Sequence, residues 1–365
     1  MGAVESRGSV VAGRGIRKLG RMERLVDDLV DWIEIPSVTG AEADYGDALG
    51  RRLEELGLAW ERQEVEPGRF NVLARAGTPE VVFCTHLDTV PPFFGSRREG
   101  DLVLGRGACD AKGQAAVMIE AARRLLAGGE DRLGFLFTVG EEVDGCGAAH
   151  ADGALAGGAL APDWQPRHVI VGEPTGGRFV RGHKGIAKVT LLAEGVAGHS
   201  SQDIGPSAVH ELVRCAHGLL ADSWGEHPVL GPGTLNVGQV EGGVAANVVA
   251  DRARAEVLVR TVEEPEVVLE RIRRHLGPHV RLAEGVKGYG PVEFLVPEGL
   301  VGEVVAFGTD APFLRSWGTP LLCGPGSILD AHTDGEKVSV GELEEAVGRH
   351  VETVTGLLAR SDAEA

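Results

Sequence analysis

The feature that most restricts the fold is a set of almost wholly apolar runs that alternate with stretches of helical spacing. Residues 81–85 and 133–138 have no polar face, which is typical of strands buried on both sides of a sheet. Between them, apolar residues at helical spacing predict a helix over 114–126. The same two criteria predict helices over 23–35 and 41–56 and strands over 71–74 and 168–173. This alternation predicts an α/β layer architecture.

The pattern changes after about residue 180. Strands are predicted over 188–193, 235–240, 253–260 and 280–283, and helices over 207–220 and 265–276. Their order, β-α-β-β-α-β, is that of a split ferredoxin-like unit, which can form a small domain of its own. The first pattern then returns, with strands over 304–307 and 320–323 and a helix over 340–358. We therefore predict a domain of residues 180–290 inserted into a larger one formed by 22–179 and 291–365, after a disordered extension over 1–21.

Composition excludes several classes of protein. The formal net charge is -18, which argues against a nucleic-acid partner because phosphates need a basic face. No apolar run approaches the roughly 20 residues that cross a bilayer, and residues 1–21 lack the apolar segment of a secretory signal. Five widely spaced cysteines form no C-x-x-C pair. These observations predict a cytoplasmic protein, with Met22 as an alternative start.

Acids and histidines follow the predicted strands at the points where each strand ends. They are His86, Asp88, Asp110, Glu141, Glu142, Glu173 and His332. In an open α/β sheet the ligand crevice lies outside the carboxyl ends of the strands. Carboxylates crowded there repel one another unless cations neutralise them, and imidazole with carboxylate suits zinc, cobalt or manganese. Singly, each residue has an ordinary reading as a solvated loop side chain, but the ordered set predicts a site for two divalent ions.

Two short spacings within this set carry further predictions. In H-x-D, the Asp88 carboxylate can accept a hydrogen bond from the ring of His86 and so orient it. In E-E, one of Glu141 and Glu142 can bind metal while the other takes a proton from water. The motifs of a serine hydrolase nucleophile, a P-loop and a dinucleotide site are all missing from the sequence.

Six strings contain these residues or their neighbours: T-H-L-D-T-V-P (85–91), G-R-G-A-C-D-A-K-G (105–113), G-E-E (140–142), V-G-E-P-T (171–175), G-H-S-S (198–201) and G-P-G-S-I-L-D-A-H-T-D-G-E (324–336). In this order they resemble the zinc aminoacylase and carboxypeptidase family that includes acetylornithine deacetylase and succinyl-diaminopimelate desuccinylase. The resemblance extends from about residue 23 to the C-terminus. It implies a zinc-exopeptidase-like catalytic domain, with a mixed central sheet and helices on both faces, and an inserted lid.

The resemblance also implies a role for each site residue. Asp110 would bridge two zinc or cobalt ions, with His86 and Glu173 completing one site and Glu142 and His332 the other. Glu141 would be the general base and Asp88 the residue that orients His86. In the lid, His199 would help to hold the scissile carbonyl oxygen; His183, His210 and His217 are weaker candidates. Asn247 and Arg260 would bind the substrate carboxylate, although a surface ion pair is an equal reading of Arg260. Gly324 and Gly326 would allow close approach of the substrate.

The implied activity is hydrolysis of an amide by a water activated at the two metal ions. The string R-G-H-K-G (181–185) is more similar to acetylornithine deacetylases than to desuccinylases. We therefore predict that the substrate is N-acetylornithine or a related N-acyl lysine or citrulline, in arginine or other amino-acid biosynthesis. A dipeptidase, a carboxypeptidase, a desuccinylase and a non-enzymatic binding protein remain alternatives. A homodimer formed through the lid is implied by the resemblance alone.

Overall fold

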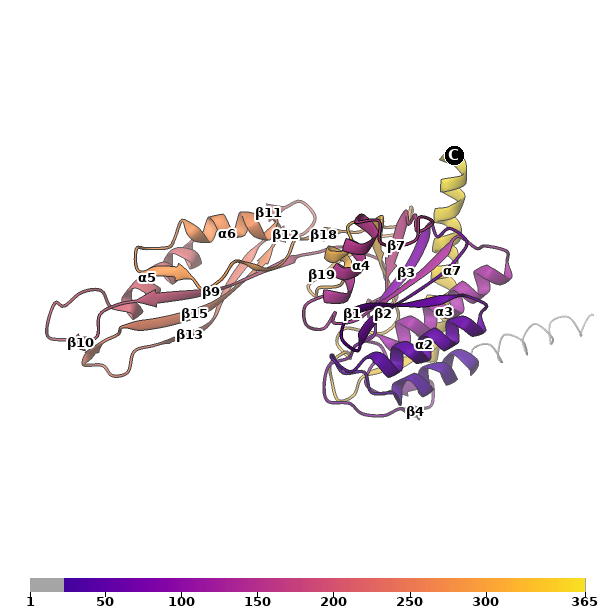
Figure 1. Ribbon diagram of the computed structural model, residues 1–365, viewed down its shortest axis with the longest axis horizontal. Coiled ribbons are helices and arrows are strands. Elements are labelled where there is room, and N and C mark those ends of the chain that lie inside the picture. The colour runs from indigo at the N-terminus through magenta and orange to yellow at the C-terminus, as the bar shows by residue number, and fades with distance from the viewer. Residues whose placement is uncertain (1–22, 365) are drawn as a thin grey trace, which may run out of the picture. The chain divides into compact units, whose positions relative to one another are not determined.

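The computed structural model describes residues 23–364, so the extension predicted over 1–21 lies outside the described residues. The chain divides into two compact units (Figure 1). Unit 1 comprises the described residues up to Val180, Phe294–Gly302 and the chain from Thr309 onward, and unit 2 comprises Arg181–Glu293 and Glu303–Gly308. The first segment of unit 2 therefore ends slightly beyond the predicted range of 180–290. Its second segment, Glu303–Gly308, lies outside that range.

Unit 1 is built on a mixed sheet whose central strands are buried on both faces. In spatial order the strands are β1 (Trp60–Glu66), β2 (Arg69–Ala76), β6 (Leu133–Thr138), β3 (Val81–His86), β7 (His168–Val171) and β20 (Thr319–Leu322). The last four are parallel, whereas β2 is antiparallel to both β1 and β6. Every residue of β3 and β6 is buried, which explains why their sequences have no polar face.

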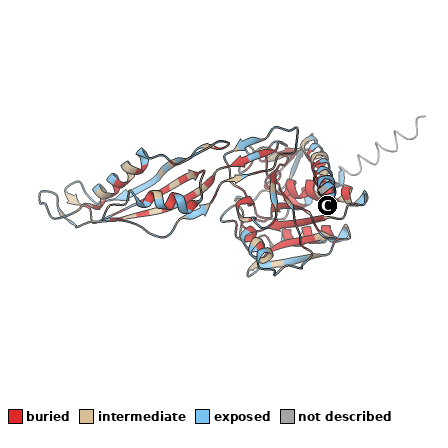
Figure 2. Ribbon diagram, turned by 90° about the horizontal axis from the view of Figure 1, so that it is seen from above, coloured by how far each residue is buried: buried red, intermediate tan, exposed pale blue. Residues whose placement is uncertain are grey.

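Helices cover both faces of this sheet. Gly46 of α2 (Ala43–Glu55) lies against Phe70 and Val72, on one face of β2. Gly147 of α4 (Cys146–Ala156) lies against Asn71, whose side chain points to the opposite face. Helical residues 23–33, α3 (Lys112–Ala127) and α7 (Val340–Glu364) contribute to the same apolar core as α2, and Figure 2 shows the buried residues along the strands. The predicted mixed sheet with helices on both faces is confirmed.

Shorter elements complete unit 1. They are the sheet β21–β5–β4 (Lys337–Ser339, Leu102–Leu104 and Arg97–Glu99) and the 3-10 turn η1 (Ala311–Phe313). Beside β20, Leu322 pairs with Val180, the first residue of β8 (Val180–His183). Within the described part of the chain, no helix combines the length and the apolar character needed to cross a membrane.

Unit 2 is an antiparallel sheet with two helices packed against it. The sheet order is β13 (Thr234–Gly242), β15 (Arg252–Thr261), β9 (Gly185–Glu194) and β16 (Val280–Leu282), with β17 (Lys287–Tyr289) also paired to β9. α5 (Ala208–Ala221) and α6 (Pro265–Arg273) share an apolar core with these strands. In chain order the elements follow the predicted β-α-β-β-α-β pattern. Short pairs lie at its ends: β10 (Gly198–His199) with β14 (Val248–Val249), and β11 (Glu226–His227) with β12 (Gly231–Pro232).

One buried side chain of unit 1 predicts how stability depends on pH. His350 of α7 is 1% exposed and packs edge-on to Phe83, and neither ring nitrogen has a hydrogen-bond partner among the described residues. Burial, with the neighbouring Arg349, lowers the pKa of His350 to about 4. Above pH 6.5 the ring is neutral in both the folded and the unfolded chain. As the pH falls from 6.5 to 4, only the unfolded chain takes up this proton, so folding loses up to about 3 kcal/mol.

Replacing His350 with methionine is therefore expected to make the protein more resistant to acid. Between pH 7.5 and pH 5, the variant should lose about 2 kcal/mol less free energy of unfolding than the wild type. Denaturant titrations of both proteins check this, with a chelator present so that the metal-site residues titrate alike in the two. A difference in stability that does not change with pH would contradict the prediction.

Candidate metal centre and active site

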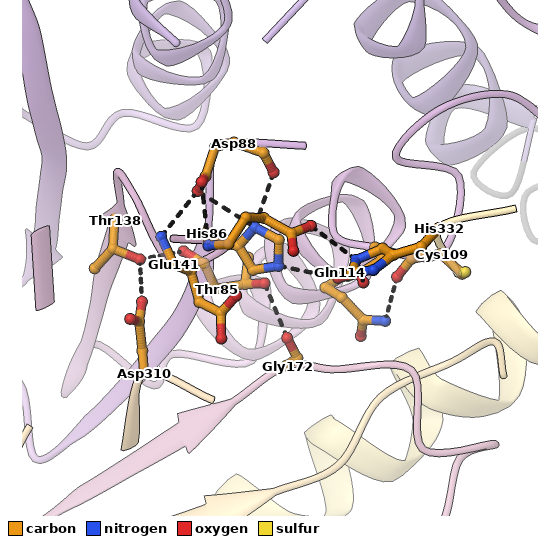
Figure 3. A network of polar contacts seen from close by, with 12 residues as sticks. Thr85, His86, Asp88, Cys109, Gln114, Thr138, Glu141, Gly172, Asp310 and His332 are labelled. Carbon is orange, nitrogen blue, oxygen red and sulfur yellow. Dashed lines mark hydrogen bonds and ion pairs between the residues drawn. The ribbon is translucent and has the colours of Figure 1, made fainter. Parts of the chain in front are cut away.

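The parallel strands of unit 1 bring most of the predicted ligands to one edge of the sheet. His86 is the last residue of β3, Glu141 and Glu142 lie in the turn after β6, and Glu173 follows β7. The carboxyl ends of parallel strands meet at the same edge, which is where an α/β sheet binds its ligands. Asp110 joins them from the loop before α3, and His332 from the loop between β20 and β21. Figure 3 shows several of these side chains together.

Asp110 lies between two histidines. Its Oδ1 is 2.9 Å from Nε2 of His86, and its Oδ2 is 3.1 Å from Nε2 of His332. The same nitrogen of His332 lies 3.0 Å from Oε1 of Glu142. Ligand atoms of His86, Asp110 and Glu142 all fall within 4.8 Å of one another. One carboxylate with an imidazole at each oxygen is the arrangement that a bridging ligand between two cations needs.

The charges of this cluster favour bound cations. Burial raises the pKa of Glu173 well above its usual range, and Glu141 raises it further. Burial and neighbouring carboxylates also raise the pKa of Glu141, against the opposing effect of His86. For His332, contacts with Asp110 and Glu142 raise the pKa to about 10. Two divalent cations would satisfy these acids and both imidazoles at once, so the residues present fit a dinuclear centre.

Asp88 supports the site differently from the sequence prediction. The shorter contact of His86 Nδ1 is with the backbone carbonyl oxygen of Asp88, at 2.8 Å, whereas the carboxylate lies 3.6 Å away. A carbonyl oxygen only accepts, so Nδ1 carries the proton and Nε2 is the nitrogen that faces Asp110. The Asp88 carboxylate instead accepts the Thr39 hydroxyl and the backbone N–H groups of residues 140, 141 and 142. It therefore shapes the turn that carries Glu141 and Glu142.

Three buried residues near the centre were not predicted. Asp310 accepts a hydrogen bond from the Thr138 hydroxyl at 2.5 Å, and burial raises its pKa to about 7. Gln114 donates to the carbonyl oxygens of Cys109 and Pro325, and Glu336 accepts backbone N–H groups of the Asp110 loop. A signal existed for Asp310, which follows the strand predicted over 304–307. Glu336 ends the string quoted at 324–336 but was given no role, and nothing in the sequence distinguishes Gln114 from surface residues.

The substrate residues predicted in unit 2 do not lie together. His199 pairs with Val248, and the carbonyl oxygen of Asn247 accepts the N–H of Ser200 at 3.0 Å, so these two predicted residues are neighbours at the β10 end. Arg260 pairs with Thr234 near the other end of β15. Figure 1 shows β10 and β11 at opposite ends of this unit. Residues 252–260 alone span about 26 Å of strand, so a small substrate cannot contact Arg260 and His199 of the same chain.

Gly324 and Gly326 are required by the packing of the chain itself. A Cβ on Gly324 would lie 1.9 Å from Oε1 of Gln114, and one on Gly326 would lie 2.4 Å from Cβ of Cys109. Gly326 also has φ +78, which other residues rarely adopt. The space that a Cβ would take on both glycines is therefore filled by side chains of unit 1, and the approach of a substrate to their backbone stays a prediction.

Comparison with known proteins identifies relatives along most of the chain. The peptidase dimerisation domain profile of the M20 type matches residues 181–283, and that of peptidase family M28 matches residues 71–157. The chain is 37% identical to a peptidase M20 domain-containing protein of Schizosaccharomyces pombe, over 86% of this chain and 80% of the relative. It is 35% identical to a probable carboxypeptidase of Aspergillus niger, over 91% and 89%. The crystal structure of aminopeptidase PepT from Bacillus cereus has the same fold, with a TM-score of 0.74 at 21% identity over 90% of this chain and 97% of that one.

Proposed function

Because the chain belongs to the M20 peptidase family, we propose that it is a metal-dependent hydrolase that removes the acyl group from a small N-acyl amino acid. The observation that carries the proposal is the position of Asp110, with each carboxylate oxygen facing a different histidine. A carboxylate held in this way could serve two cations, and paired cations would be suited to the hydrolysis of amides.

Each residue of the centre has a place in the proposed reaction. His86 and Glu173 would hold one ion and Glu142 and His332 the other, with Asp110 shared between them. Zinc or cobalt ions bound there would supply Lewis acidity to the water and to the amide carbonyl. Glu141 lies near His86, Glu142 and Asp110 and would not serve as a ligand; nearby positive charge would favour its ionised form. Its carboxylate would take a proton from the attacking water and return it to the amine that leaves.

N-Acetylornithine is the first candidate substrate. It is supported by the R-G-H-K-G string at 181–185, although His183 in that string is buried and packs edge-on to Tyr289. The string therefore supports the proposal as a sequence signal and not as a set of substrate contacts. The alternative, a carboxypeptidase or dipeptidase that uses the same centre, is supported by the name of the A. niger relative.

A substrate panel separates these activities. We expect kcat/KM for N-acetylornithine to exceed the values for N-succinyl-diaminopimelate and for dipeptides by at least about tenfold, a difference of roughly 1.4 kcal/mol in transition-state binding. Initial rates measured with zinc and with cobalt, at equal metal content, provide the test. A preference for dipeptides or for C-terminal residues of longer peptides would assign the alternative activity, and no hydrolysis of any amide would remove both.

We further propose a cytoplasmic homodimer that forms through unit 2. The match of residues 181–283 to a peptidase dimerisation domain supports the dimer. So does the separation of Arg260 from His199, because a substrate held by both residues would need them from two chains. Five free cysteines, four of them buried, are consistent with a reducing compartment.

A further inference from the structure

We infer that Glu336 and Arg106 form a positioning pair that holds the loop of Asp110 and the loop of His332 in register for metal binding. The inference rests on the proposed dinuclear centre. It concerns two residues that are not ligands and that lie 230 positions apart in the chain.

Glu336 binds the Asp110 loop through both its side chain and its main chain. Its Oε1 accepts the backbone N–H groups of Cys109, at 3.2 Å, and of Asp110, at 3.1 Å. Its carbonyl oxygen accepts the N–H of Gly105 at 3.1 Å. The loop that carries Asp110 is therefore attached to residue 336 at both of its ends.

Arg106 fixes the carboxylate that makes these bonds. Its Nη1 lies 2.6 Å from Oε2 of Glu336, so the two oxygens of Glu336 serve different partners. The guanidinium also donates from Nε to the carbonyl oxygen of Pro92 and stacks on the ring of Phe94, 4.9 Å from its centroid. Glu336 consequently has little freedom to rotate away from the Asp110 loop.

The attachment matters because His332 is only four residues before Glu336. His332 and Asp110 lie 222 positions apart in the chain, yet Nε2 of His332 must stay about as close to Oδ2 of Asp110 as the observed 3.1 Å. His332 also has φ +62, an uncommon conformation outside glycine. Glu336 joins the two loops directly, so a shift of one loop carries the other with it.

The burial of the pair points to positioning. Both side chains are at most 1% exposed. Removing two charges from water costs several kcal/mol, and a well-packed apolar pair of similar volume is often as stable or more stable. A contribution to folding stability therefore does not by itself explain why a charged pair occupies these two buried positions. A carboxylate with two oxygens, in contrast, is suited to hold two backbone N–H groups and an arginine at defined places.

The test is the Glu336→Gln variant of the full chain, because glutamine keeps the shape and removes the charge that faces Arg106. The dissociation constants of Zn²⁺ are measured by competition with a chromophoric chelator, and the visible spectrum of the Co²⁺-loaded protein reports the ligand geometry. Loss of an outer partner of a metal site typically weakens binding by about 10- to 100-fold. We expect a loss in that range, with a changed Co²⁺ spectrum.

Glu120→Gln is the matched control. Glu120 is also buried and bonded to arginines, Arg123 and Arg124, but its contacts stay within α3. Its Zn²⁺ affinity and Co²⁺ spectrum should match those of the wild type, and its thermal stability calibrates the loss of a buried carboxylate charge. If Glu336→Gln loses stability as Glu120→Gln does while keeping wild-type affinity and spectrum, the pair is structural and the inference is wrong.

Two further outcomes are distinguishable. If Glu336→Gln does not fold, Arg106→Lys is measured in the same way, because it keeps the charge and loses the planar fork; weaker Zn²⁺ binding supports the inference and unchanged binding overturns it. If the wild-type chain itself binds no Zn²⁺ or Co²⁺, the proposed centre fails and the positioning role falls with it.

Discussion

Glu141→Gln is expected to lower kcat by about 10²- to 10⁴-fold, the range that general acid–base catalysis contributes. Glutamine has the size of glutamate but cannot accept the proton of the attacking water. Glu141 is buried near His86, Glu142 and Asp110, and the proposed reaction uses it as a base and not as a ligand, so the variant should keep its metal content. Steady-state rates and elemental analysis of the same preparation provide the measurement.

Glu142→Gln is the matched control for this prediction, since it makes the same change one residue further along the turn. Glu142 contacts His332 and belongs to the ligand cluster, so this variant should lose metal as well as activity. A Glu141→Gln protein that loses metal would show that Glu141 is a ligand. One that retains nearly the full rate would show that the proton acceptor lies elsewhere.

The second large effect is expected at Asp110. Asparagine keeps one carbonyl oxygen and presents an NH₂ group to the other histidine, so it cannot serve both His86 and His332 as a ligand. Metal affinity should fall by more than the about 10- to 100-fold that an outer partner costs, and hydrolysis should fall to the limit of detection. Metal content after gel filtration and chelator competition provide the measurement.

Asp310→Asn, measured at about pH 8, where a carboxyl with a pKa of about 7 is mostly ionised, separates the loss of a ligand from the loss of charge. Asp310 is a buried carboxylate that interacts electrostatically with His86 and Asp88, but its hydrogen bond is to Thr138. Replacing it removes the charge without removing a contact to either histidine, so metal content should stay near that of the wild type. If both variants lose metal equally, the negative charge of the region and not the position of Asp110 determines binding.

The sequence was sufficient to find the residues whose position follows from the sheet. His86 and Glu173 come directly after apolar strands, and the parallel pairing of β3, β6 and β7 brings strand ends to one edge. The β-α-β-β-α-β order of unit 2 was also readable, because each element has a clear apolar period. Both successes depend on local patterns that report burial.

Other features could not be predicted, either because the segment has no clear apolar pattern or because the residues that contact it are distant in the chain. The strand β1 has mostly exposed, charged residues and shows no apolar run, and the glycine- and alanine-rich α4 has little amphipathic contrast. The role of Glu336 depends on its contacts with Arg106 and the Asp110 loop, which lie more than 200 residues earlier in the chain. The resemblance assigned Arg260 and Asn247 to the same substrate carboxylate. Asn247 lies before the start of β15 and Arg260 near its end, so the length of this strand separates them.

The interruption of unit 1 by unit 2 has a consequence for the synthesis of the protein. A ribosome delivers His86, Asp110, Glu142 and Glu173 first, then more than a hundred residues of unit 2, and His332 and Glu336 only after them. A nascent or truncated chain therefore holds an acidic cluster without the histidine and the attachment that complete it. The cluster of unit 1 is therefore complete only after the whole of unit 2 has been synthesised.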